Sequence, residues 1–128
     1  MGDTSLVLLN NITERIICCA IEVHRVLGPG LLESIYEKAL CYEFDSKDIK
    51  YQNQVFVPVI YKQNPIGEFR IDLLVENEVI VELKAVDRIE SVFKAQLLSY
   101  LKVTSKKLGL LINFNVPVLK DGIKRIIL

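Results

Sequence analysis

Hydrophobic positions in the first third of the chain recur every three or four residues, the spacing of one helix face. The pattern predicts a helix over residues 11–27, with Asn11 or Thr13 as its N-cap. The "GPG" at residues 28–30 ends it, and a second helix follows over residues 31–45. The apolar faces expected to be buried comprise Ile16, Ile17, Ala20, Ile21 and His24 in the first helix, and Leu32, Ile35, Tyr36, Ala39 and Leu40 in the second.

From residue 51 the period of the pattern changes to two, which predicts β-strands. The segment "QVFVPVIY" contains Pro58, so we expect an edge strand or an interrupted one. A turn is predicted at residues 63–67, a hairpin over residues 68–76 and 79–85, a helix over residues 92–103 capped by Ser91, and strands over residues 108–114 and 122–128. This order predicts an α/β sandwich with a mixed sheet, in one domain over residues 1–128.

The two faces of the predicted hairpin differ in chemistry because side chains alternate across a strand. One face is wholly apolar and should lie on the core: Ile71, Leu73, Val75, Val79, Val81, Leu83 and Ala85. The other carries Arg70, Asp72, Leu74, Glu76, Ile80, Glu82 and Lys84. If the loop is centred on Asn77, the residue numbers of each cross-strand pair sum to 154, and Asp72 then faces Glu82.

Two opposed carboxylates destabilise a sheet, and partial shielding by Leu74 and Ile80 would increase the repulsion. Such a pair needs a shared proton or a bridging cation. Lys84 supplies one positive charge on the same face, and an oxygen-only ligand set suits Mg²⁺ or Mn²⁺. The alternative is an ordinary solvated face, on which Arg70 pairs with either acid.

The composition is that of a globular domain: 51% of the 128 residues are hydrophobic and 25% are charged. The formal net charge is zero, which argues against a strongly basic nucleic-acid binder. The basic residues available for phosphate contacts form two local groups, Lys102, Lys106 and Lys107, and Lys120, Lys124 and Arg125. The three cysteines, Cys18, Cys19 and Cys41, suggest reduced thiols in a cytoplasmic protein. We expect no membrane span and no secretory signal.

Several short motifs occur in a fixed order along the chain. "EVHRVLGPG" precedes "GLLESIY", which reads G-x-x-E-x-x-Y; Asp72, then Glu82-Leu83-Lys84, and then "QLLSY" at residues 96–100 follow. In this order the motifs resemble the GxxExxY protein family, a branch of the PD-(D/E)XK nuclease-like superfamily. The resemblance runs from His24 to the C-terminus, and it departs from the superfamily pattern at Ile71, where the name calls for proline.

The resemblance implies a restriction-endonuclease-like core, with a mixed β-sheet flanked by helices in the order α-α-β-β-β-α-β-β. It implies that Asp72 and Glu82 bind Mg²⁺ or Mn²⁺, with the Leu83 carbonyl as a further ligand. It also implies that Lys84 orients or activates the attacking water. Glu33 would join the acidic cluster, and Gln96 and Tyr100 would lie beside the site.

Other roles remain open for some of these residues. Glu33 lies in the first turn of its helix, where the helix dipole favours an acid in any case. His24 fits a satisfied core or interface histidine better than a site residue. Tyr36 and Tyr100 can simply pack, with their hydroxyls satisfied at the rim.

The leading hypothesis is therefore a metal-dependent nuclease that cleaves phosphodiester bonds in DNA with a metal-activated water. The alternative is a catalytically inactive nucleic-acid-binding or assembly module that keeps the fold. A third hypothesis is hydrolysis of a small phosphorylated ligand. Because the chain is too small to grip much duplex alone, we expect a homodimer.

Overall fold

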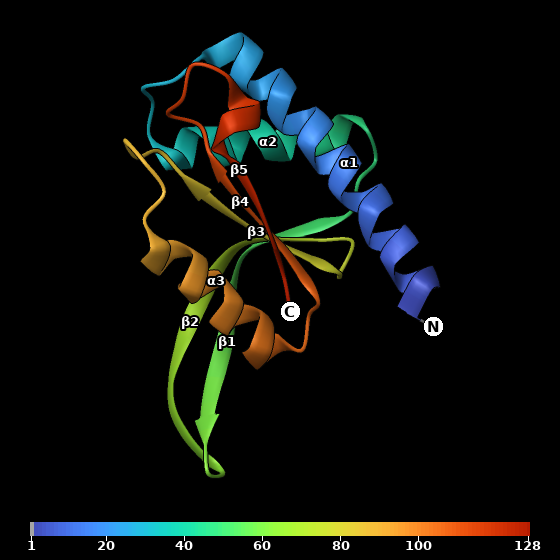
Figure 1. The fold of residues 1–128 in the computed structure, drawn as a ribbon, viewed down its shortest axis with the longest axis vertical. Coiled ribbons are helices and arrows are strands. Elements are labelled where there is room, and N and C mark those ends of the chain that lie inside the picture. Colours follow the sequence, from blue (N-terminus) through green and yellow to red (C-terminus); the bar gives the residue numbers. More distant parts are fainter. Residues whose placement is uncertain (1) are drawn as a thin grey trace.

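The computed structural model describes residues 2–128, with side chains from Leu6 onward. Two helices, three strands, a third helix and two further strands follow one another in the order that the sequence predicts, with one additional short 3₁₀ helix (Figure 1). The elements are α1 (Gly2–Leu27), α2 (Glu33–Ser46), β1 (Tyr51–Tyr61), β2 (Asn64–Val75), β3 (Val79–Lys84), α3 (Ser91–Thr104), β4 (Leu108–Asn113), the short 3₁₀ helix η1 (Leu119–Gly122) and β5 (Ile123–Ile127). The predicted domain begins at Met1, which lies outside the described residues.

The strands form one mixed sheet in the order β1-β2-β3-β4-β5. Only β3 and β4 run parallel; the other neighbours are antiparallel. A parallel pair needs a crossover connection, and α3 supplies it. The predicted α/β class with a mixed sheet is thus confirmed, and β1 is an edge strand, as Pro58 indicated.

Two apolar cores lie on opposite faces of the sheet. The larger joins α1 and α2 to the sheet through residues such as Ile16, Tyr36 and Leu83. The smaller lies under α3 and contains Ile71, Leu74, Ile80, Leu97, Leu101 and Leu111. Figure 1 shows α3 on one side of the strands and α1 with α2 on the other. The second hairpin face is therefore covered by a helix at Leu74 and Ile80, where shielding from water was expected. The alternative of an ordinary solvated face is wrong at Glu82, which is buried.

The predicted helix boundaries need correction. Helix α1 begins at Gly2 rather than at residue 11. Its additional N-terminal part is anchored by Leu9, which packs into the larger core. Thr13 is inside the helix, where its hydroxyl donates to the Asn10 carbonyl at 3.0 Å, so neither it nor Asn11 is an N-cap. Similarly, α3 has Glu90 at its N-cap without a side-chain capping bond, and Ser91 is its first helical residue.

The buried faces of the first two helices also differ from the prediction. On α1 the buried positions around the predicted stripe are Ile16, Cys19, Ala20 and Val23, whereas Ile21 is exposed. On α2 the buried residues are Tyr36, Leu40 and Phe44, whereas Leu32 and Ile35 are exposed. Helix α2 starts at Glu33 instead of residue 31. Each helix contacts the core with a face slightly rotated from the one that its apolar residues suggested.

The first hairpin turns earlier than predicted. Strand β2 begins at Asn64, which pairs with Tyr61, so the reversal takes place at Lys62 and Gln63 rather than over residues 63–67. Both turn residues have positive φ, 48° and 71°, as a tight two-residue hairpin turn requires. Lysine and glutamine are uncommon in such a turn, which explains why the sequence pattern missed it.

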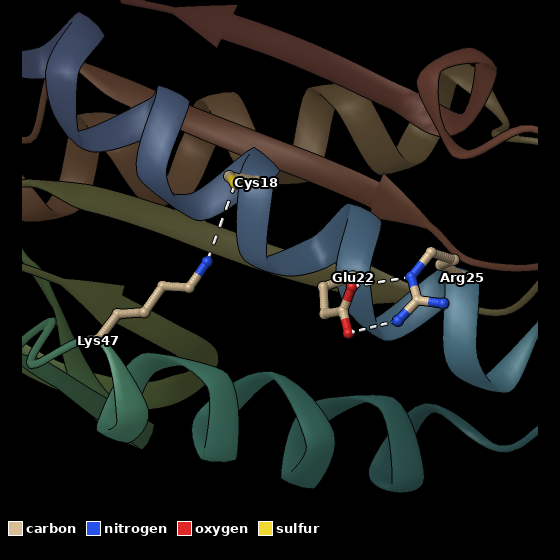
Figure 2. Close-up of polar contacts among 4 residues, drawn as sticks. All are labelled: Cys18, Glu22, Arg25 and Lys47. Atoms are coloured by element: carbon tan, nitrogen blue, oxygen red, sulfur yellow. Dashed lines mark hydrogen bonds and ion pairs between the residues drawn. The ribbon is translucent and has the colours of Figure 1, made fainter.

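Figure 2 shows two polar contacts at exposed positions of the N-terminal helices. The Lys47 ammonium group, just after α2, donates to the Cys18 thiol at 3.9 Å. Within α1, Arg25 forms a two-point ion pair with Glu22 at 2.8 and 2.9 Å. Exposed ion pairs contribute little to stability, so the apolar core holds these helices together. No helix within residues 2–128 is both long enough and apolar enough to cross a membrane.

Candidate active site

Asp72 and Glu82 lie opposite each other where the β2–β3 ladder ends. The paired residues are Val75↔Val79, Leu74↔Ile80 and Leu73↔Val81, which confirms the predicted register. At the next position along the ladder, the main-chain amides donate to side-chain carboxylates instead of main-chain carbonyls. The Asp72 amide donates to Glu82 Oε2 at 2.8 Å, and the Leu83 amide donates to Asp72 Oδ2 at 2.8 Å. One oxygen of each carboxyl group is fixed in this way, and the other has no main-chain donor within residues 6–128.

The environment of Glu82 disfavours its charged form. Its side chain is only 6% exposed. Burial, followed by the negative charge of Asp72, raises the pKa of Glu82 from 4.5 to about 8. The hydrogen bond from the Asp72 amide and the charge of Lys84 act in the opposite direction. At neutral pH this carboxyl group therefore holds a proton, unless a cation takes the proton's place.

Lys84, at the end of β3, and Glu33, at the start of α2, line the same cavity as the acid pair. The Lys84 ammonium group lies 4.7 Å from the centre of the Phe93 ring on α3. Glu33 is the first residue of α2, and its Oε2 accepts a hydrogen bond from the Ala85 amide at 3.3 Å. Its negative charge also contributes, as the smallest of the causes, to the raised pKa of Glu82.

Helix α3 contributes Gln96 and Tyr100. The Tyr100 ring stacks on Phe69 of β2, with centroids 4.1 Å apart and planes at 1°. Burial and then the charges of Glu82 and Asp72 raise the pKa of Tyr100, whereas a hydrogen bond from Gln96 lowers it. The phenol therefore lies within electrostatic reach of both acids.

All predicted site residues except Leu83 line one cavity of about 540 Å³. Its lining consists of Glu33, Phe56, Glu68, Phe69, Arg70, Asp72, Glu82, Lys84, Gln96 and Tyr100. A neighbouring cavity of about 450 Å³, towards α2, shares Glu33, Arg70 and Asp72 with it. Leu83 lines only this neighbouring cavity; it belongs to the larger core, and its amide donates to Asp72. The catalytic and metal-binding roles of these residues stay predictions.

Four cavity residues were not predicted as site residues: Phe56, Glu68, Phe69 and Arg70. All four come from the β1–β2 hairpin, whose register depends on the turn that the pattern missed. Within residues 6–128 Arg70 makes no ion pair with either acid, so the predicted pairing is wrong.

The strand alternation also shifts beside the acid pair. Ile71 was predicted to share the face of Leu73, but it packs under α3 in the smaller core. On the neighbouring strand β1, Gln54 lies between the pairs Asn53↔Leu73 and Val55↔Ile71 and has a φ of 54°. This left-handed residue interrupts the regular conformation of β1 next to the position where Ile71 and Leu73 of β2 face different cores.

His24 and Tyr36 lie outside the cavity and have structural roles. The His24 Nε2–H donates to the Val116 carbonyl at 2.7 Å, as expected for a satisfied histidine. The fully buried Tyr36 donates to the Gly28 carbonyl at 2.6 Å and accepts from the Leu31 amide at 3.1 Å. Tyr36 thus holds the "GPG" loop in place ahead of Glu33.

Asn113 is a further supporting residue, and no pattern in the sequence pointed to it. It is 1% exposed at the end of β4, beside Lys84. Its amide donates to the Val86 carbonyl at 2.9 Å and accepts from the Val86 amide at 3.0 Å. These bonds hold the chain just after Lys84, while the Phe114 amide donates to the Lys84 carbonyl at 2.9 Å.

Comparison with known proteins gives one match that covers most of the chain. The family model described as the PD-(D/E)XK nuclease superfamily matches residues 10–126. The chain belongs to the PD-(D/E)XK nuclease superfamily. The searches of curated proteins and of solved structures returned no match. The match does not test the GxxExxY branch, which stays a prediction.

PD-(D/E)XK nucleases generally use divalent metals, and a divalent ion in this cavity would require oxygen ligands from its side chains. Among the side chains of residues 6–128, no three His, Cys, Asp or Glu residues form a group that could hold an ion unaided. Mg²⁺, however, is commonly bound by one or two carboxylates, with water and substrate phosphates completing its shell. Asp72 and Glu82, each with one oxygen fixed by an amide, fit that pattern.

Proposed function

We propose that the protein is a divalent-metal-dependent nuclease that hydrolyses phosphodiester bonds in DNA. Membership of the PD-(D/E)XK nuclease superfamily supports the reaction class. The observation that carries the proposal is that Glu33, Asp72, Glu82, Lys84, Gln96 and Tyr100 line one cavity. Three separate elements, α2, the β2–β3 hairpin and α3, supply these six side chains to it.

Asp72 and Glu82 are the side chains that would hold Mg²⁺ or Mn²⁺, with the Leu83 carbonyl as a further ligand. Such an ion, when bound, supplies Lewis-acid activation of the phosphodiester and of the attacking water. The raised pKa of Glu82 supports this assignment, because a buried acid pair that resists ionisation gains most from a cation.

The remaining cavity residues act on the substrate and on water in this proposal. The Lys84 ammonium group positions the attacking water and stabilises the negative charge that develops on the phosphoryl oxygens. Glu33 contributes a further acceptor beside the end of β3. Gln96 and Tyr100 orient the substrate from α3, and the stacking of Tyr100 on Phe69 fixes the phenol in place.

The test is cleavage of plasmid and oligonucleotide DNA in Mg²⁺ or Mn²⁺, with Asp72→Asn and Lys84→Ala compared with the wild type. We expect either variant to lose 10²-fold or more in rate, since each removes a group that acts on the developing charge. Matched controls are Asp121→Asn and Lys47→Ala, exposed residues that do not line the cavity. Equal cleavage by all five proteins would refute the assignment.

A non-catalytic nucleic-acid-binding module is the second candidate. The lack of a three-residue metal group among the described residues favours it. Calorimetric titration with Mn²⁺ separates the two candidates: a nuclease should bind the ion, and Glu82→Gln should weaken the binding at least tenfold. DNA binding that metal leaves unchanged, together with no cleavage, would support the module.

Assembly and location complete the proposal. We expect a homodimer, because one small neutral chain offers little surface for a duplex, and sedimentation velocity measures this directly. A cytoplasmic location is consistent with the three free cysteines. Burial raises the pKa of both Cys19 and Cys41, which keeps these thiols unreactive.

A further inference from the structure

The outer wall of the cavity comes from a projecting two-stranded arm. Pairing between β1 and β2 continues from Tyr51↔Val75 to Tyr61↔Asn64, whereas β3 pairs with β2 only as far as Leu73. Residues 55–70 therefore extend past β3 as an arm, which Figure 1 shows reaching beyond the rest of the sheet. Phe56 and Arg70 are directly opposed on this arm, and both line the cavity.

Phe56 presents a free aromatic surface beside the acid pair. Its side chain is 62% exposed. The other two aromatic residues of the cavity, Phe69 and Tyr100, stack on each other and so cover one face of each ring. Within the described part of the chain, Phe56 takes part in no aromatic pair. Its ring is therefore available to a ligand.

The charges of the cavity limit the kind of nucleic acid that it can attract. Its lining contains four acids, Glu33, Glu68, Asp72 and Glu82, and two bases, Arg70 and Lys84. Duplex binding depends mainly on many phosphate contacts from lysine and arginine, and this lining cannot provide them. Stacking of a base on an aromatic ring needs no positive charge. It does need an exposed base face, which unpaired nucleotides have and duplex nucleotides lack.

We propose that Phe56 stacks on an unpaired nucleobase and that Arg70 contacts a neighbouring phosphate, so that the cavity takes single-stranded DNA. The inference rests on the proposed nuclease function and specifies its substrate. In this arrangement the arm holds one nucleotide while the adjoining phosphodiester reaches Asp72, Glu82 and Lys84. Phe56 is a specificity-determining residue here, because it touches the substrate but not the reacting atoms.

The test is binding of a fluorescein-labelled 12-nucleotide single strand, and of the same strand annealed as a duplex, by fluorescence anisotropy. Ca²⁺ replaces Mg²⁺ so that binding is measured without cleavage. We expect the wild type to prefer the single strand, and Phe56→Ala to weaken single-strand binding roughly 5- to 150-fold. Phe56→Trp should retain the affinity because it keeps a stacking surface.

The matched control is Tyr42→Ala, which removes an aromatic side chain that is 71% exposed on α2 and does not line the cavity. It should bind both DNA forms as the wild type does. Thermal melting of each variant checks that the fold is intact. A Phe56→Ala protein with unchanged single-strand affinity, or with an equal loss for the duplex, would overturn the inference.

Failure of the inference and failure of the proposed function give different results. If the wild type cleaves DNA in Mg²⁺ while Phe56→Ala cleaves single strands equally well, the nuclease function stands and the role of Phe56 is refuted. If the wild type neither cleaves DNA nor binds a single strand, both are refuted. Single-strand binding that depends on Phe56 without any cleavage supports the stacking role alone.

Discussion

At the scale of single residues, the acid pair is tolerated because its carboxyl groups act as acceptors for the sheet. Asp72 and Glu82 each accept a main-chain amide of the other strand, where a carbonyl would ordinarily stand. The geometry follows from local sequence: the loop centred on Asn77 sets the register, so the pair could be predicted. The hydrogen bonds could not, because they depend on how the strands separate beyond Leu73.

The raised pKa of Glu82 makes the stability of the metal-free protein depend on pH. Between 4.5 and about 8 the folded protein holds a proton that the unfolded chain has lost. The free energy of unfolding therefore falls as the pH rises through this range, by on the order of 3–5 kcal/mol at most. Glu82→Gln removes the titrating group, so its stability should change less between pH 5 and pH 8.

Urea denaturation in EDTA at several pH values measures this difference. Glu14→Gln, an exposed acid on α1, is the control and should keep the pH dependence of the wild type. Parallel pH profiles for the wild type and Glu82→Gln would contradict the predicted proton uptake by Glu82.

At the scale of elements, the order of helices and strands could be predicted from the period of apolar residues, but their contacts could not. The Lys62–Gln63 turn lacks glycine and asparagine, and so the β1–β2 register and the cavity wall around Phe56 were missed. The approach of α3 to the sheet depends on long-range packing. A Cβ at Gly109 on β4 would lie 2.9 Å from the Leu97 side chain, so glycine permits this close contact.

Gly109→Ala should therefore strain the packing of α3. Leu97 is buried, so it cannot move freely, and overpacking a core costs about 1–3 kcal/mol. The helix also carries Gln96 and Tyr100, so cleavage should fall along with stability. Denaturant unfolding measures the loss. Lys94→Ala is the control, because Lys94 is an exposed residue of the same helix, and its stability should change by less than about 0.5 kcal/mol.

At the scale of the whole molecule, zero net charge conceals an uneven distribution. The cavity lining is acidic overall, whereas Lys120, Lys124 and Arg125 lie on η1 and β5, at the sheet edge opposite β1. The sequence could identify these basic groups but not their position relative to the site. Their placement decides whether DNA is held by many phosphates along the surface or by a few contacts at the cavity.

The salt dependence of single-strand binding distinguishes these two modes. If Arg70 and Lys84 make the only phosphate contacts, the slope of log K against log salt should be about −1.4, because each contact contributes about −0.7 for single strands. Arg70→Gln should then make the slope shallower by about 0.7, and Lys124→Gln should leave it unchanged. Anisotropy titrations in Ca²⁺ over a series of KCl concentrations measure the slope. A value steeper than about −4, reduced by Lys124→Gln, would mean that the strand runs across β5 and that the cavity does not dominate binding.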